Sequence, residues 1–159
     1  MMTTLHASRG PLHSIMSVPL AVLVTFAAWG CRNQAGTDQV CFQDHCVDVE
    51  VVRTPKERMK GLQGRTSLNR DQGMLFIFDL NQPQRFWMKD TLISLDMIWL
   101  DFAKRVVHIE HNVPPCVGDP CPSYGPRESI LYVLEVNAGH AREMGLAVGT
   151  QLQFHLISK

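Results

Sequence analysis

Apolar and polar residues alternate along much of the chain beyond residue 40, which is the pattern of half-buried β-strands. Val47, Val49 and Val51 are separated by carboxylate side chains, a period of two that places one face of a strand against a core. Further strand-like runs lie at residues 74–78, 86–88, 95–100, 105–110, 130–136 and 151–157. Seven or eight short strands predict a mainly β domain, either a compact β-sandwich or a partial barrel.

Two short helices are expected between these strands. The sequence Thr54-Pro55-Lys56-Glu57 predicts a helix start, because threonine can cap a helix, proline suits the first helical position and glutamate completes a capping box. We expect this helix to end at Gly61 or Gly64. A second helix of one or two turns is expected at residues 140–144, before Gly145.

The first thirty residues differ from the rest of the chain. They contain no Asp, Glu or Lys, a single arginine, Arg9, and an apolar run from Ile15 to Trp29. This run is shorter than the ~20 apolar residues of a membrane-spanning helix and is typical of a secretory signal peptide. We therefore predict a signal peptide at residues 1–30, a polar tether at 31–39 and a single β domain at 40–159.

Cys31 directly follows Gly30 at the end of the apolar run. A small residue before a cysteine resembles the bacterial lipobox, in which the cysteine receives lipid, although Ala28 and Trp29 stand where leucine and a small residue are usual. A lipidated Cys31 would hold the domain on the periplasmic or cell-surface side of a bacterial membrane. The alternatives are ordinary cleavage, which leaves a free thiol, and an uncleaved anchor.

Without Cys31, an even number of cysteines remains, which can pair fully in an oxidising compartment. The four form two copies of a Cys-x4-Cys spacing, Cys41 with Cys46 and Cys116 with Cys121. A local disulfide within each copy is the simplest of three possible pairings, and we expect Cα separations of about 4.4–6.8 Å. Zinc is the alternative, but zinc ligands are usually spaced more closely and exported proteins rarely use them.

Charge and metal-ligand patterns narrow the possible partners. If Arg9 leaves with the signal peptide, 14 of the 15 Lys and Arg residues remain against 15 Asp and Glu. No basic stripe appears, so nucleic acid is not an expected partner. His108 and Glu110 would share one face of a strand while His111 falls on the other or in a turn, so we predict neither a metal site nor a cofactor.

Three charged residues lie inside apolar strand-like runs, Lys89, Asp96 and Glu135. A charge in such a run must face solvent, a partner or a cavity. If the three converge, they form a polar patch of the kind found in small-ligand sites. The apolar walls of that predicted site are Trp87, Met88 and Tyr124.

Two other roles are open for these charges. Lys89 and one carboxylate could form an ion pair that braces the sheets, while Arg58 and Arg65 cap backbone carbonyl groups. Paired carboxylates also admit general acid–base hydrolysis by Asp96 or Glu135. The nucleophile-elbow, zinc-protease and P-loop motifs are absent from the sequence, so no established catalytic motif favours an enzyme.

Several short motifs follow one another along the chain. They are Glu57-Arg58-Met59-Lys60-Gly61-Leu62 with Arg65, Gly73-Met74-Leu75-Phe76, Phe86-Trp87-Met88-Lys89 with Thr91, Leu95-Asp96, Val133-Leu134-Glu135 and Ala138-Gly139. Over about residues 45–157 the chain thereby resembles the DUF192 family, a domain of unknown function. Asp90 departs from the asparagine expected there.

The resemblance implies a compact β-sandwich of jelly-roll type in an exported or membrane-attached protein, with no established activity. We expect structural roles for Arg58, Gly61, Arg65 and Gly139. The sequence as a whole predicts an exported, lipid-anchored and non-enzymatic module that binds a small ligand or an envelope protein. An envelope hydrolase is the alternative.

Overall fold

Nine β-strands and two short helices form residues 36–157, the part of the chain that the computed structural model describes. The strands are β1 (Gln39–Phe42), β2 (His45–Val52), β3 (Gln72–Gln82), β4 (Phe86–Trp87), β5 (Leu95–Leu100), β6 (Val106–Val113), β7 (Ser123–Tyr124), β8 (Ile130–Asn137) and β9 (Gln153–His155). The helices are α1 (Pro55–Lys60) and α2 (His140–Glu143). The predicted mainly β class with two short helices is confirmed. The additional strands, β1 and β7, are short.

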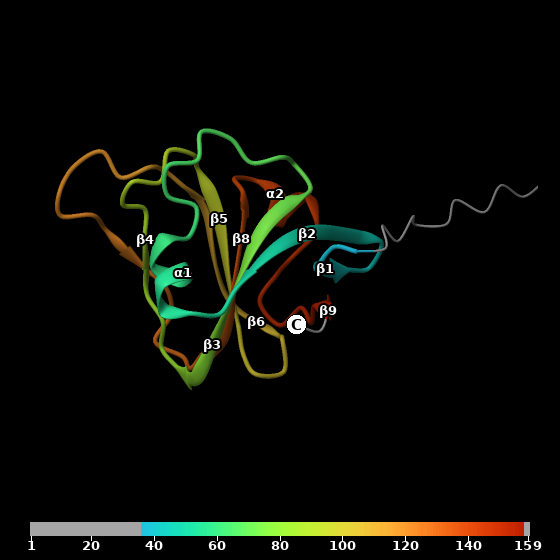
Figure 1. Cartoon of the computed structure of the whole chain (residues 1–159). Coiled ribbons are helices and arrows are strands. Elements are labelled where there is room, and N and C mark those ends of the chain that lie inside the picture. Colours follow the sequence, from blue (N-terminus) through green and yellow to red (C-terminus); the bar gives the residue numbers. More distant parts are fainter. Residues whose placement is uncertain (1–35, 158–159) are drawn as a thin grey trace, which may run out of the picture. The chain divides into compact units, whose positions relative to one another are not determined.

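Seven strands form one sheet in the order β6-β5-β8-β3-β2-β1-β9, and β4 pairs with β7. Within residues 36–157, β2 and β3 form the only parallel pair, and α1 lies in the crossover between them. The sheet curls into a half-barrel (Figure 1), and a bridge between Arg105 and Gln151 links the start of β6 to the segment before β9. Of the two predicted arrangements, the structure has the partial barrel. The parallel pair distinguishes it from a wholly antiparallel jelly roll.

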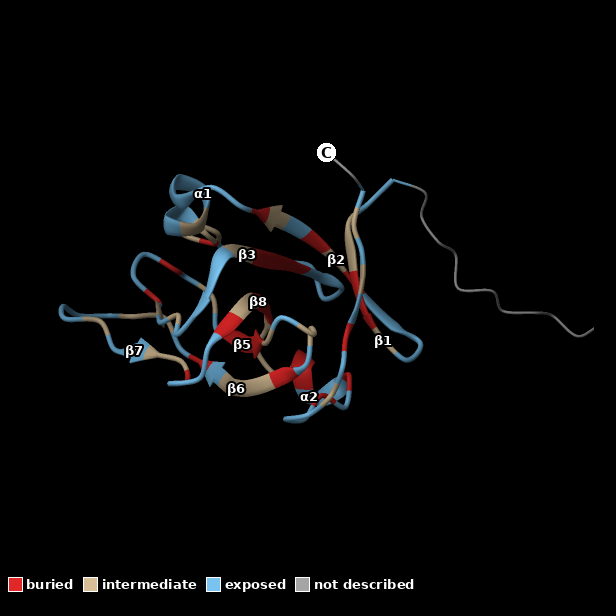
Figure 2. Cartoon of the chain, turned by 90° about the horizontal axis from the view of Figure 1, so that it is seen from below, coloured by how far each residue is buried: buried red, intermediate tan, exposed pale blue. Residues whose placement is uncertain are grey.

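Both faces of the main sheet are buried, because side chains alternate between faces along each strand. On one face, the α2-side core packs against α2 and the segment before β9. Its buried members are Val40, Val47, Val49, Leu75, Ile98, Leu100, Val106, Leu134, Val136, Ala141, Met144, Leu146 and Leu152. On the opposite face lies the α1-side core. Its buried members are Val52, Leu62, Met74, Phe76, Met88, Leu95, Met97, Trp99, Val113, Ile130 and Val133. Figure 2 shows the buried residues along the central strands β3 and β5.

Helix α1 begins and ends where the sequence predicts. The Thr54 side chain accepts a hydrogen bond from the Glu57 backbone N–H at 3.3 Å, and the Glu57 carboxylate accepts one from the Thr54 backbone N–H at 2.9 Å. This reciprocal capping box satisfies N–H groups that have no partner inside the helix. Gly61 ends α1 with a φ of +45°, and a Cβ there would lie 3.3 Å from the Phe76 ring. The predicted structural role of Gly61 therefore has two physical causes, its backbone conformation and a close approach.

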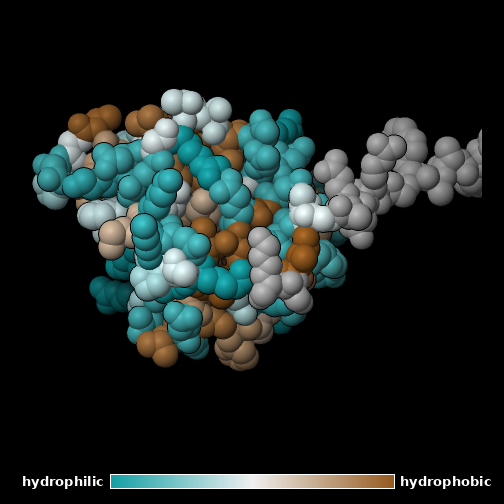
Figure 3. Space-filling model, in the orientation of Figure 1, coloured by the Kyte–Doolittle hydropathy of each residue, from teal (hydrophilic) through white to brown (hydrophobic). Residues whose placement is uncertain are grey.

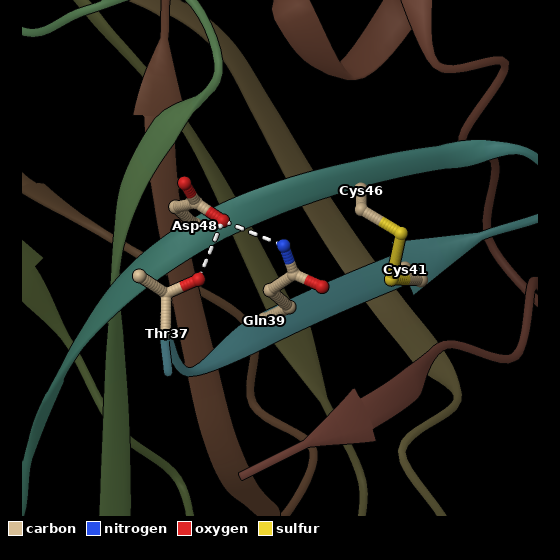
Figure 4. The surroundings of a disulfide bond; sticks show 5 residues. All are labelled: Thr37, Gln39, Cys41, Cys46 and Asp48. Carbon is tan, nitrogen blue, oxygen red and sulfur yellow. Dashed lines mark hydrogen bonds between the residues drawn. A yellow bond between two sulfur atoms is a disulfide. The ribbon is translucent and has the colours of Figure 1, made fainter. Parts of the chain in front are cut away.

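Both predicted disulfides are present. Cys41 is bonded to Cys46 across the tip of the β1–β2 hairpin, where the two residues face one another in register (Figure 4). Cys116 is bonded to Cys121 in the segment between β6 and β7. The Cα separation is 5.7 Å in the second bridge, inside the expected range, and 4.1 Å in the first, slightly shorter than expected because the two strands are directly paired.

The predicted signal peptide, Cys31 and most of the predicted tether lie outside the described residues. Among residues 36–157, no helix is long and apolar enough to cross a membrane. The same residues contain no group of three or more His, Cys, Asp or Glu side chains that could hold a metal ion. The His108 ring lies 3.0 Å from the Glu110 carboxylate, as expected for two residues on one face of a strand.

Candidate functional site

A cavity of about 490 Å³ opens beside α1 on the α1-side face of the sheet. Its walls come from α1 and the residues that follow it, from β3, and from β4 with the β3–β4 connection. A neighbour of β3 in the main sheet, β8, contributes Glu135. A concave site of this volume is large enough for a small-molecule ligand.

Aromatic rings form much of the cavity wall. Phe76, Phe78, Phe86 and Trp87 all line it. The Phe86 ring packs edge-to-face against Phe76 at a centroid distance of 4.9 Å and against Phe78 at 6.2 Å. These contacts fix the rings in place. Trp87 is 51% exposed, so its indole lies at the mouth of the cavity and remains free to contact a ligand.

Arg58 closes one side of the cavity and is fully engaged there. Its guanidinium donates hydrogen bonds to the backbone carbonyls of Arg53 and Ile77, the latter at 2.8 Å, and lies 3.4 Å from the Asp79 carboxylate. It also lies 5.0 Å from the centre of the Phe78 ring. The role proposed from the sequence, capping of backbone carbonyls, describes Arg58 well.

Arg65 has a different partner from the one expected. Its guanidinium donates two hydrogen bonds of 2.6 Å to the two carboxylate oxygens of Glu50, a bidentate ion pair rather than a carbonyl cap. The hydrogen bonds from Arg65 lower the pKa of Glu50 below its usual range. The pair joins β2 to the segment after α1, so Arg65 still has a structural role.

Arg85, which the sequence did not single out, lines the cavity and joins its wall to β7 and the residue after it. Its guanidinium donates to the Ser123 hydroxyl at 3.0 Å, to the Ser123 carbonyl and to the Gly125 carbonyl at 2.7 Å. These bonds hold the β3–β4 connection against β7. Gly125 permits the close approach, since a Cβ there would lie 2.7 Å from the Gln84 carbonyl oxygen.

Glu135 is a polar residue on the α1-side face of the sheet, and it lines the cavity. It pairs in register with Met74 of β3 and Met97 of β5, both buried, and is itself 5% exposed. Within residues 36–157 its carboxyl has no hydrogen-bond or ion-pair partner, and burial alone raises its pKa to about 8. Near neutral pH the group is therefore mostly protonated and uncharged.

Thr91 is the second buried polar residue that lines the cavity. It is 6% exposed, and its backbone N–H donates to the Met88 carbonyl at 3.2 Å. The Thr91 hydroxyl has no hydrogen-bond partner among the described residues. Neither this oxygen nor the Glu135 carboxyl is completely enclosed by protein atoms. Both groups therefore face the open volume of the cavity, where a ligand can meet them.

Asp96 lies on the opposite face of the sheet from Glu135. Its two carboxylate oxygens accept hydrogen bonds from the backbone N–H groups of Asn112 at 2.8 Å and Ala141 at 2.9 Å. The His111 ring lies 3.7 Å away. Asp96 thus holds the end of β6 and the start of α2. The structure does not bring it to Glu135, so the two do not form a carboxylate pair of the kind that acid–base hydrolysis requires.

Three other predicted site residues, Met88, Lys89 and Tyr124, do not line the cavity. Met88 is buried in the α1-side core and Tyr124 is half-buried in β7, opposite Phe86. Lys89 is exposed, with its Nζ 5.7 Å from the Trp87 ring centre, and forms no ion pair within residues 36–157. Of the six predicted ligand-binding residues, Trp87 and Glu135 line the cavity.

Most of the aromatic wall was not predicted from the sequence. Phe76 and Phe78 lie two residues apart in one strand, which places their rings on the same face. That spacing was a usable signal. The contribution of Phe86 depends on the position of β4, a strand of two residues, and no local pattern predicts that position. On the face of the molecule that Figure 3 shows, hydrophobic side chains are exposed in places between hydrophilic ones.

Comparisons with known proteins identify relatives but no activity. The DUF192 family model, described as uncharacterized ACR, matches residues 38–154. A protein of unknown function from Novosphingobium aromaticivorans is 31% identical, with a TM-score of 0.66 over 74% of this chain and 83% of its own. A putative transcription regulator from Sinorhizobium meliloti is 30% identical, with a TM-score of 0.67 over 74% of this chain and 92% of its own. No curated protein matches the chain.

Proposed function

The chain belongs to the DUF192 family, and we propose that it is a non-enzymatic binding module whose cavity beside α1 takes a small ligand with an apolar, preferably aromatic, body. The observation that carries the proposal is Glu135, a buried carboxyl without a protein partner that faces this cavity. Leaving a buried polar group unpaired costs free energy. A ligand that hydrogen-bonds the carboxyl would recover that free energy.

The remaining cavity residues fit binding better than catalysis. The rings of Phe76, Phe86 and Trp87 offer a large contact area, while Glu135 and Thr91 supply a few fixed polar groups, the usual composition of a ligand site. The arginine side chains nearby are held by carbonyl and carboxylate partners. The carboxylate that could complete an acid–base pair, Asp96, lies on the other face of the sheet.

A neutral apolar fluorophore, N-phenyl-1-naphthylamine, tests this proposal directly. We expect the wild-type domain to enhance the fluorescence of this probe in a saturable way. Trp87→Ala should weaken binding by about 5- to 20-fold, because it removes one aromatic wall. Phe102→Ala is the matched control, since Phe102 is also exposed and aromatic but does not line the cavity. Absence of saturable binding, or equal losses in the two variants, would contradict the proposal.

We also propose that the domain works outside the cytoplasm, attached to a bacterial membrane through a lipid on Cys31. The support is the signal-like first thirty residues together with two disulfides, which are typical of oxidising compartments. Cys31→Ser should move the protein from the membrane fraction to the soluble exported fraction. Mass spectrometry that finds an unmodified mature chain beginning elsewhere would exclude the anchor.

The proposed partners are therefore a membrane, through the anchor, and a small ligand, with an envelope protein as the other candidate. The description of the Sinorhizobium protein as a putative transcription regulator is not transferred to this chain. The Lys and Arg residues of the present chain equal its Asp and Glu residues in number, 15 of each. Nucleic-acid binding normally needs a basic surface.

A further inference from the structure

Resting on the proposed function, we infer that the ligand carries a protonated amine, whose ammonium group meets the Glu135 carboxylate inside the aromatic wall of the cavity. Arg58, Lys60 and Arg85 line the cavity, but within residues 36–157 none of them forms an ion pair with Glu135.

Among the described residues, the charged groups around the cavity form no ion pair with Glu135. On α1, Arg58 is engaged by two carbonyls and Asp79. Lys60 lines the cavity, but its side chain is exposed to solvent. On β3, the Asp79 side chain is 81% exposed. Beyond β3, the Arg85 guanidinium is directed to the Ser123 and Gly125 carbonyls.

Two strands away from Glu135 on the same face, Glu50 is held by Arg65, and Glu110 lies 3.0 Å from the His108 ring. The other charged groups near Glu135 lie on the opposite face or outside the cavity lining. Asp96 of the neighbouring strand β5 bonds to backbone groups on the opposite face. Lys89 and Asp90, in the segment after β4, are exposed and outside the cavity lining. Within residues 36–157, no cation is thus placed to neutralise an ionised Glu135.

The wall around this carboxyl suits a cation for a second reason. The faces of aromatic rings carry a partial negative charge and attract ammonium groups, best when the site is desolvated. Phe76, Phe86 and Trp87 line the same cavity as Glu135. An ammonium group would therefore gain ring contacts and a charge-assisted hydrogen bond at once. A carboxylate ligand would gain neither from Glu135.

Binding of an amine has a proton balance that can be measured. In the free protein the Glu135 carboxyl holds its proton, because burial raises its pKa to about 8. When the ammonium arrives, the O–H bond breaks, the carboxylate keeps the electron pair and pairs with the ammonium, and the proton passes to the buffer. At pH 7 this releases about 0.9 proton for each ligand bound.

Isothermal titration calorimetry with three matched indoles tests the inference. The probes are tryptamine, a cation, tryptophol, which is neutral, and indole-3-propionate, an anion. We expect tryptamine to bind about 10- to 100-fold more tightly than tryptophol, with indole-3-propionate weakest. Titrations in two buffers of different ionisation enthalpy should show proton release with tryptamine alone. The affinity for tryptamine should rise from pH 5 to pH 8, because protonation of Glu135 competes with binding.

Glu135→Gln is the test variant, since glutamine matches the shape of the protonated carboxyl and cannot ionise. It should reduce tryptamine affinity to the level of tryptophol and abolish proton release. The wild-type proton measurement needs no variant, so the inference stays testable if Glu135→Gln folds poorly. Tryptophol binding as tightly as tryptamine, without proton release, would overturn the amine inference while leaving cavity binding intact. Failure of all three indoles together with N-phenyl-1-naphthylamine would overturn the proposed function as well.

Discussion

Two buried carboxyl groups lie in neighbouring strands of one sheet and have opposite surroundings. Asp96 of β5 and Glu135 of β8 are 0% and 5% exposed. Asp96 faces the α2-side core, where two backbone N–H groups bond to its two oxygens. Glu135 faces the α1-side core and the cavity, with no partner among the described residues. Burial is nearly the same in both, but hydrogen bonding is not.

This difference separates a structural acid from a candidate binding group. A buried carboxylate whose oxygens are satisfied contributes to the fold, since it supplies acceptors for backbone groups that would otherwise lie unpaired. When a buried carboxyl lacks partners and faces a cavity, burial destabilises its charged form, and the group is accessible to a ligand. The state of hydrogen bonding, more than the depth of burial, therefore indicates which acid belongs to the site.

The largest expected effect is the difference in stability loss when each of the two acids is replaced by its amide. Asp96→Asn places an NH₂ group opposite one of two N–H donors, which should lower the free energy of unfolding by about 3 kcal/mol, because hydrogen bonds to charged groups contribute about 1.5–3 kcal/mol. Glu135→Gln at pH 6 should change it by less than about 1 kcal/mol, since glutamine resembles the protonated acid. Urea denaturation at pH 6 measures both. Equal losses would contradict the assignment of different roles to the two acids.

The next effect is a pH dependence that belongs to Glu135. Its folded pKa of about 8 lies above the ordinary value of 4.5, so the folded state binds more protons than the unfolded state between these values. The stability contribution is fully present below pH 4.5 and is lost as pH rises through 8. Between pH 6 and pH 8 the loss is about 2 kcal/mol.

Urea denaturation of wild type and Glu135→Gln at pH 6, 7 and 8 checks this sign. The wild-type domain should lose stability with rising pH relative to the variant, whose curve lacks this contribution. Asp96→Asn serves as the control and should retain the wild-type trend. Parallel curves for wild type and Glu135→Gln would show that Glu135 ionises at its ordinary pKa, and the cavity would then lack its proposed protonated group.

Local sequence patterns were sufficient for the elements that local interactions determine. The capping box at Thr54 and Glu57 needs residues three positions apart, and it predicted the start of α1. The Cys-x4-Cys spacing predicted both disulfides, since each closes a short segment. The alternation of β2 predicted burial of Val47 and Val49. In each case the partners lie within a few residues of one another.

The site could not be predicted in the same way, because it depends on strand register. Asp96 lies opposite Val136, and Glu135 lies opposite Met97. A shift of the register by one residue would have placed both acids on the same face. The register of β5 with β6 also shifts between Leu95 and Met97, where His111 and Asn112 form an irregularity. That irregularity supplies one N–H group to Asp96, and no local sequence pattern predicts it.

The smallest expected effect concerns Lys89, the third charge that the sequence placed in an apolar run. Had Lys89 braced the sheets through a buried ion pair, its removal would cost about 3–5 kcal/mol. In the structure Lys89 is exposed, and its closest charge-related contact is the Trp87 ring, 5.7 Å from Nζ. Exposed contacts of this kind contribute about 0.5–1 kcal/mol.

Lys89→Met should therefore lower the free energy of unfolding by less than about 1 kcal/mol, measured by urea denaturation at pH 6. The double variant with Glu135→Gln should equal the sum of the single changes to within about 0.5 kcal/mol. The reason is that Lys89 is exposed, Glu135 is buried, and no ion pair joins them within residues 36–157. A loss above about 3 kcal/mol for Lys89→Met, recovered in the double variant, would instead show that the lysine and the glutamate form the brace.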